Sequence, residues 1–266
     1  MKGRVLIIAG SDSSGGAGIQ ADIKTVTALD GYAATAITAL TAQNTLGVHG
    51  IFPIPPDFVR QQMAAVLSDI GVDAIKTGML ADSGIVETVA ETLAAMTQSV
   101  PLIVDPVMIS SSGTRLLSAD AIVVLKHRII ANAFILTPNI PEAETLLGRK
   151  IESLDAMIEA AAALQALGPP IVVLKGGHLA GDTVRDVVRE GAALYVLEAP
   201  RIDTRHTHGT GCTLASAIAT GIAQGMAPRA AIERAHAYVQ AAIRAAPGLG
   251  HGRGPLNHAV TPLRPA

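Results

Sequence analysis

The sequence predicts one α/β domain in which helices cover both faces of a mostly parallel sheet. Short apolar runs at residues 5–9, 102–104 and 171–174 alternate along the chain with segments of helical periodicity. Apolar runs without polar alternation are typical of strands buried on both faces, as in parallel sheets. Because no low-complexity linker or convincing repeat divides the chain, we expect a single domain over residues 1–266.

Local composition defines each element in turn. β-branched residues bounded by glycine or proline indicate strands, whereas apolar residues three and four positions apart indicate helices. A different pattern at 184–197 predicts a β-hairpin that turns at Glu190-Gly191. The predicted strands are 5–9, 33–40, 74–77, 102–104, 134–136 and 171–174, and the predicted helices are 19–29, 57–70, 85–96, 119–130, 142–147, 156–167, 213–224 and 230–245.

The bulk composition excludes several classes of protein. The net charge is −2 and no basic block stands out, which argues against nucleic acid or an anionic membrane as the main partner. One cysteine rules out an internal disulfide and is typical of a reducing compartment. The apolar runs are too short to span a membrane, and the run at 5–9 is too short for a signal peptide. We therefore expect a cytoplasmic protein.

Glycines and polar residues follow each apolar run. In an open parallel sheet, ligands bind in the loops at the carboxyl ends of the strands, so this distribution indicates a binding site. The loops are 10–18, 43–45, 76–79, 105–108, 137–142, 175–178 and 206–212.

The first of these loops has a phosphate-binding glycine spacing but lacks the Lys and Ser or Thr of a P-loop. Gly16-x-Gly18-x-x-Ala21 matches a relaxed dinucleotide motif, yet the next strand ends in Gln43 rather than in an acid. A tight turn without a ligand is the alternative. Asp22 and Lys24, early in the following helix, favour a ligand.

The last loop contains the only cysteine of the chain. Thr207, Gly209, Thr210 and Gly211 leave backbone N–H groups accessible at the start of a helix, which predicts an anion site. The same helix end would lower the pKa of Cys212. Alternatively, the glycines only cap the helix and Cys212 is a small core residue.

Two other side-chain sets have the character of metal ligands. His206-x-His208 lacks further ligands nearby, so we expect a loop role rather than a zinc site. Asn139-x-x-Glu142 begins a helix with Pro141 at its first turn, and its oxygens could hold a hydrated Mg²⁺ or only start the helix. Asp105 ends an apolar strand, where a half-buried carboxylate needs a cation or a partner.

Taken together, these motifs resemble the ribokinase-like superfamily of small-molecule kinases. Within it, the chain is most similar to the hydroxymethylpyrimidine/phosphomethylpyrimidine kinase family of thiamin biosynthesis. The similarity covers nearly the whole chain in order. It is carried by AGSDSSGGAGIQADIKT, ITALTAQNT, KTGML, DPVM, TPNIPEAETLLG, LKGGH, THGTGCTLASAIA and the ending Gly250-His251-Gly252-Arg253-Gly254-Pro255.

The resemblance implies a three-layer ribokinase-like fold, a homodimer, and Mg²⁺ as the cofactor of an ATP-dependent enzyme. ATP would phosphorylate the hydroxymethyl group of 4-amino-5-hydroxymethyl-2-methylpyrimidine, and a second ATP would convert the monophosphate to the diphosphate. Catalysis would fall to Cys212, as the proton acceptor, with Gly209, Thr210 and Gly211. The implied substrate residues are Gln43, Asp22, Gly10 and Met79, the implied ATP residues are Lys175, Thr207, Asn139 and Asp105, and the implied metal residues are Glu142 and Asp105.

The chain departs from the family pattern in one loop. Many relatives carry a lysine after Asp-Pro-Val-Met, where this sequence has Ser110-Ser111-Ser112-Gly113, and Arg115 is the candidate replacement. Two other functions stay open: a pyridoxal or pyridoxine kinase, and a nucleotide-binding module without catalysis. Gln43 and the residues around Met79 would decide between the two rings.

Overall fold

The computed structural model describes residues 2–109, 113 and 116–260. Within them the strands are β1 (Arg4–Asp12), β2 (Tyr32–Asn44), β3 (Gly47–Pro53), β4 (Ala74–Thr77), β5 (Leu102–Val104), β6 (Ile135–Leu136), β7 (Ile171–Leu174), β8 (Thr183–Glu190) and β9 (Ala193–Pro200). The helices are α1 (Gly18–Ala28), α2 (Pro56–Asp69), α3 (Ser83–Ala94), α4 (Ala119–Arg128), the 3₁₀ turn η1 (Ile130–Asn132), α5 (Ile140–Leu147), α6 (Leu154–Gln165), α7 (Thr210–Ala223) and α8 (Pro228–Arg244).

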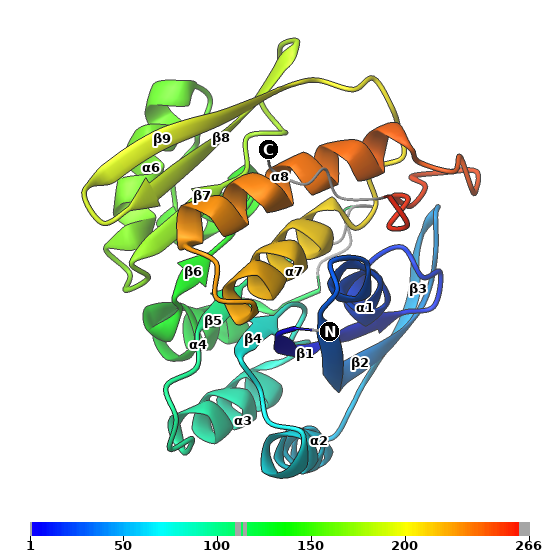
Figure 1. The fold of residues 1–266 in the computed structure, drawn as a ribbon, viewed down its shortest axis with the longest axis vertical. Coiled ribbons are helices and arrows are strands. Elements are labelled where there is room, and N and C mark those ends of the chain that lie inside the picture. The colour runs from blue at the N-terminus through cyan, green and yellow to red at the C-terminus, as the bar shows by residue number, and fades with distance from the viewer. Residues whose placement is uncertain (1, 110–112, 114–115, 261–266) are drawn as a thin grey trace.

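The strands form a single sheet in the order β3-β2-β1-β4-β5-β6-β7-β8-β9 (Figure 1). The six central strands, from β2 to β7 in that order, pair in parallel. β3 at one edge, and β8 and β9 at the other, pair antiparallel. The mostly parallel sheet expected from the sequence is confirmed.

Two hydrophobic cores, one on each face of the sheet, hold the layers together. Successive side chains of a strand point to opposite faces, so Leu6 and Ile8 of β1 pack with α2 to α6 while Val5 and Ile7 pack with α1, α7 and α8. Figure 1 shows these last three helices in front of the sheet. This is the three-layer αβα arrangement that the resemblance implies.

The fully buried strands match their predictions best. β4, β5 and β7 begin and end at the predicted residues, and the hairpin of β8 and β9 turns at Gly191 as expected. By contrast, the sequence prediction missed β3. This edge strand has no buried residue and contains His49 and Gly50, so it lacks both the apolar run and the alternation by which strands are recognised.

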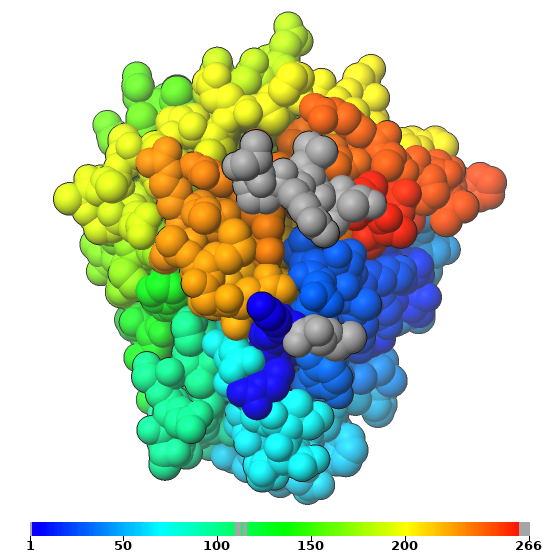
Figure 2. All heavy atoms as spheres, in the orientation of Figure 1, coloured from blue at the N-terminus to red at the C-terminus, as the bar shows by residue number. Residues whose placement is uncertain are grey.

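The arrangement of strands and helices sets the place of the site. The parallel strands end on the same side of the sheet, where the N-terminus of α7 meets the loop after β1. The last described residues, red in Figure 2, pack beside the blue N-terminal part of the chain and the orange α8. Among the described residues, none of the helices has both the length and the apolar character needed to cross a bilayer.

Candidate active site

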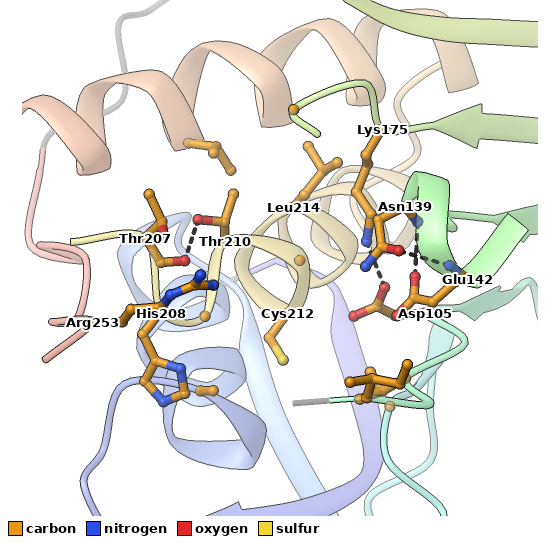
Figure 3. Close-up of a pocket in the computed structure, with 18 of the residues that line it drawn as sticks. Asp105, Asn139, Glu142, Lys175, Thr207, His208, Thr210, Cys212, Leu214 and Arg253 are labelled. Carbon is orange, nitrogen blue, oxygen red and sulfur yellow. Dashed lines mark hydrogen bonds and ion pairs between the residues drawn. The ribbon is translucent and has the colours of Figure 1, made fainter. Parts of the chain in front are cut away.

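A cavity of about 750 Å³ opens at the carboxyl ends of the parallel strands. It extends from Gln43 and Met79, beside β2 and β4, past the N-terminus of α7 to Asp186 and Gln240. The sequence-predicted residues that line it are Gly10, Gln43, Met79, Asp105, Asn139, Glu142, Lys175, Thr207, Gly209, Thr210, Gly211 and Cys212. The loops after successive strands therefore contribute to one continuous site (Figure 3).

Asp22 is the exception, and its predicted place in the substrate pocket is wrong. The side chain is fully buried and does not line the cavity. Both of its oxygens accept hydrogen bonds from Lys76 Nζ at 2.9 Å, and Ser216 Oγ donates to one of them at 2.7 Å. The face of α1 that carries Asp22 points into the protein, so the carboxylate serves a buried ion pair.

The N-terminus of α7 is held close to the loop after β1. Gly209 has a φ of 87°, and a Cβ there would collide with the carbonyl oxygen of Gly16. No side chain caps α7, and Thr210 Oγ1 donates instead to the carbonyl oxygen of Thr207 at 2.7 Å. The first turn of the helix thus faces the cavity with its N–H groups and positive dipole end, as an anion site requires.

Cys212 stands in that first turn and is half-buried. The expected lowering of its pKa is wrong: desolvation raises the pKa of the thiol from its usual 9.0 to about 12. The Lys76 ammonium opposes this effect, whereas the carboxylates of Asp22 and Asp105 add to it. The thiol is therefore protonated at neutral pH in the unliganded protein.

Two charged groups face each other beside the start of α7 (Figure 3). Lys175 Nζ donates to Asp105 Oδ1 at 2.9 Å. A Cβ on Gly211 would lie 3.1 Å from Lys175 Nζ and 3.4 Å from Asp105 Oδ2, so only glycine leaves both groups this close to the helix. The ammonium provides positive charge beside the anion site, and Asp105 has the partner that a buried carboxylate needs.

Asn139 and Glu142 both cap α5 and line the cavity. Asn139 Oδ1 accepts from the Glu142 N–H at 2.9 Å, while Glu142 Oε2 accepts from the Asn139 N–H at 2.8 Å. Desolvation raises the pKa of Glu142 to about 7, with Lys175 opposing and Asp105 adding to the shift. No group of three His, Cys, Asp or Glu side chains suited to a metal ion occurs in the described part of the chain.

Asp12 and His208 are site residues that the sequence reasoning did not assign to the site. Asp12 accepts from the N–H groups of Ser14 at 2.9 Å and Ala17 at 2.9 Å, and its Oδ2 lies 2.8 Å from His208 Nε2. The signal for Asp12 was present: an Asp followed by Ser and Gly after a strand is typical of a side chain that hydrogen-bonds its own turn. For His208, the expected loop role agrees with these contacts.

Desolvation would raise the pKa of Asp12, but hydrogen bonds from His208 and Ser14 lower it to about 2. The ionised carboxylate requires a proton on His208 Nε2, which donates to it. Gln43 Nε2, 3.3 Å from the same ring nitrogen, then finds no acceptor there. Its N–H groups are left for a ligand in the cavity.

Met79 and Gly10 lie close together at the end of the cavity that Gln43 lines. Met79 is 8% exposed, and a Cβ on Gly10 would lie 3.0 Å from its Cε atom. The Met79 side chain and the Gly10 backbone are therefore in contact with each other and, with Gln43, line one end of the cavity as a slot. Ser110, Ser111, Ser112 and Arg115, for which the sequence suggested a phosphate contact or a loop over the site, lie outside the described residues.

We expect Asp12→Asn to lower the free energy of unfolding at pH 7 by roughly 1–2 kcal/mol, allowing for solvent near the loop. The folded-state pKa of about 2 lies below the usual 3.8. The stabilisation is therefore complete above about pH 4 and is lost as the pH falls toward 2. Urea unfolding of both proteins at pH 7 and pH 3 measures it, and a difference that persists unchanged at low pH would contradict this assignment.

The thiol of Cys212 can be titrated without interference, since the sequence has one cysteine. With a pKa of about 12, its alkylation by iodoacetamide should accelerate about tenfold per pH unit from pH 7 to pH 10. Mass spectrometry follows the label, and Cys212→Ala is the blank. A rate that levels off below pH 8 would show a thiol with the lowered pKa first expected.

Comparison with known proteins agrees with this site. Residues 12–257 match the sequence model of a family described as "Phosphomethylpyrimidine kinase". A "Hydroxymethylpyrimidine/phosphomethylpyrimidine kinase" of Streptomyces coelicolor is 48% identical over 96% of this chain and 93% of its own length. The "Thiamine biosynthesis bifunctional protein ThiED" of Geobacter sulfurreducens is 53% identical over 97% of this chain, which spans about half (52%) of that longer protein.

Solved structures show the same fold. A pyridoxal kinase of Bacillus subtilis in complex with ADP superposes with a TM-score of 0.89 at 38% identity, over 97% of this chain and 98% of that one. A phosphomethylpyrimidine kinase from Clostridium difficile superposes with a TM-score of 0.80 at 40% identity, over 90% and 98%. From the extent of the family match and the identity of these relatives, the chain belongs to the phosphomethylpyrimidine kinase family.

Proposed function

We propose that this protein is an ATP-dependent kinase that phosphorylates 4-amino-5-hydroxymethyl-2-methylpyrimidine and then its monophosphate. The observation that carries the proposal is the continuity of the cavity. The slot at Gly10, Gln43 and Met79 leads directly to the N-terminus of α7, where Lys175 supplies positive charge. A planar acceptor in the slot and a triphosphate beyond it would meet at Cys212.

The acceptor end suits an aminopyrimidine. Gln43 offers both a donor and an acceptor, as the edge of such a ring does, and its amide N–H groups have no acceptor on His208. Met79 would pack on the ring face, and the Gly10 backbone, which contacts Met79, would line the same side of the pocket. Asp22 would not contact the substrate. It would hold Lys76 in place through their buried ion pair.

In the first phosphorylation, the hydroxymethyl oxygen bonds to the γ-phosphorus of ATP while the bond from that phosphorus to its bridging oxygen breaks. The N–H groups at Gly209, Thr210 and Gly211 would stabilise the charge on the transferred group. Cys212 would accept the hydroxyl proton. Because the unliganded thiol is protonated, it would have to release its own proton to solvent before it could accept the proton of the substrate hydroxyl.

Thr207, Asn139 and Lys175 would contact the ATP phosphates. Mg²⁺ prefers oxygen ligands and retains waters. Asp105 and Glu142 offer carboxylate oxygens at the end of the cavity that Lys175 also lines. These residues fit an ion that is bound mainly through the triphosphate. When bound, the ion would neutralise phosphate charge; the chain itself orients the nucleotide.

Pyridoxal is the second candidate acceptor. The likeness to a pyridoxal kinase at a TM-score of 0.89 favours it, because the same backbone holds that enzyme's site. The ring-binding residues, Gln43 and Met79, distinguish the two candidates. A nucleotide-binding module without catalysis would leave the acceptor slot and Cys212 without a role.

The direct test is ³¹P NMR of the purified protein with Mg·ATP and either ring in separate samples. We expect hydroxymethylpyrimidine to give a monophosphate and then a diphosphate. In the same assay Cys212→Ala should slow the first step by about 10²–10⁴-fold, as for loss of a general base. Binding of the pyrimidine by calorimetry should be unchanged. Phosphate on pyridoxal alone would assign the enzyme to vitamin B6 salvage, and full turnover by the variant would make the thiol structural.

A homodimer is also proposed, supported by an apolar pair at the sheet edge. Leu40 and Phe52 pair in register on β2 and β3, and they are 45% and 65% exposed. A second copy of the chain would cover them. Sedimentation velocity should show a dimer that Phe52→Asp converts to monomers, whereas Val123→Asp, at an exposed site on α4, should not. A monomeric wild-type protein would refute this. The cytoplasmic location stays a prediction.

A further inference from the structure

The segment at residues 250–255 joins the acceptor end of the cavity to the phosphate end. Gly252 N–H donates to Thr45 Oγ1 at 3.2 Å, and Arg253 N–H donates to the Thr45 carbonyl oxygen at 2.9 Å. Thr45 directly follows β2, which carries Gln43. On the other side, His208 N–H donates to the Gly254 carbonyl oxygen at 3.1 Å. The backbone on both sides of Arg253 is therefore tied to a different wall of the cavity.

The glycines of this segment fix its path. A Cβ on Gly252 would collide with the carbonyl oxygen of Thr45, and one on Gly254 would collide with the ring of His206. Between them, Arg253 is the one side chain of the segment that lines the cavity. In Figure 3 its guanidinium extends between His208 and the Thr207–Thr210 turn, toward the N-terminus of α7.

The other cations of the cavity have different places. Lys76 is fully buried against Asp22, and Lys175 is paired with Asp105 on the nucleotide side. Arg201 donates to three loop carbonyl oxygens, those of Gly177, Leu179 and Gly181. Arg205 also lines the cavity, and it donates to the carbonyl oxygen of His251 at 3.4 Å. Arg253 differs because it enters beside the acceptor wall and close to the anion site.

A phosphate acceptor needs positive charge at that position. In the second phosphorylation an oxygen of the monophosphate bonds to the γ-phosphorus of ATP, and the bond to the β–γ bridging oxygen breaks as ADP leaves with its electron pair. The acceptor is a dianion, so no proton has to be removed. It must instead be brought next to another polyanion, and a guanidinium binds phosphate with two parallel hydrogen bonds.

We propose that Arg253 binds the phosphate of the monophosphate acceptor and so serves the second phosphorylation specifically. This inference rests on the proposed function. The hydroxymethyl group of the first substrate carries no charge and does not need this residue. The segment 250–255 holds Arg253 at the junction of the two ends of the cavity, where the acceptor phosphate must lie to reach ATP.

Arg253→Met tests the proposal, with Arg253→Lys and the remote, exposed Arg128→Met as comparisons. We expect Arg253→Met to lower kcat/KM for the pyrimidine monophosphate by about 10–100-fold, the effect of one charged hydrogen-bonding partner. The value for hydroxymethylpyrimidine should change less than threefold. Lysine keeps the charge but not the paired hydrogen bonds, so its effect should be intermediate. Calorimetric binding of the monophosphate without ATP should weaken in parallel.

Equal losses in both steps would overturn the proposal, since Arg253 would then act on ATP. Unchanged kinetics in both steps, or weak monophosphate binding in Arg128→Met as well, would also overturn it. A wild-type protein that phosphorylates neither pyrimidine would instead refute the proposed function, and the two failures are distinguishable. Circular dichroism melts confirm that each variant is folded before its kinetics are compared.

Discussion

The hydrogen bond between Asp12 and His208 joins two loops that are 196 residues apart in the chain. One loop forms the wall of the acceptor slot, and the other leads into α7. Because Asp12 also accepts from the N–H groups of its own turn, a single carboxylate fixes both loops at once. The contact of Gly209 with the Gly16 carbonyl lies next to it and leaves no room for a side chain. This contact therefore keeps the slot at Gly10 next to the N-terminus of α7, so that both line the same cavity.

Paired charges around the junction explain why the thiol is not acidic. Lys76 and Asp22 neutralise each other inside the protein, and Lys175 is neutralised by Asp105. Burial and the carboxylates of Asp22 and Asp105 outweigh the opposing effect of the Lys76 ammonium, so the pKa of Cys212 rises. Buried pairs of this kind contribute little to stability. Both pairs lie close enough to Cys212 to interact with it electrostatically, so an anion bound at the start of α7 would change the charge balance of the site.

Much of the fold could be predicted because buried strands have a clear signature. The apolar runs of β4, β5 and β7 are enclosed on both faces, so local sequence and tertiary environment agree. β3 has no buried face, and nothing in its composition reveals that it pairs with β2. Because these strands could be located, the polar residues that follow them could also be assigned to the cavity. Asp105, Asn139 and Lys175 were assigned in this way, and all three line it.

The errors at the site have a common physical origin. Asp22 lies in α1 shortly after the glycine loop, but the direction of a helical side chain depends on how the helix packs, which the sequence does not specify. The pKa of Cys212 depends on its burial and on the charges of Lys76, Asp22 and Asp105, which come from three other segments of the chain. The local sequence correctly predicted that Cys212 lies near the N-terminus of a helix. It could not show which charged side chains would surround the thiol.

In the proposed function, the choice of acceptor depends on very few atoms. Pyridoxal and hydroxymethylpyrimidine are both flat rings with a hydroxymethyl group, so the machinery at α7 can serve either. The amide of Gln43 can discriminate, since a site built to hydrogen-bond one edge rejects an analogue that leaves its polar groups unpaired. Here His208 already commits its Nε2 proton to Asp12, so the Gln43 N–H groups must find their acceptor on the ligand. The contact that holds the two loops together therefore also sets the hydrogen-bonding character of the ring pocket.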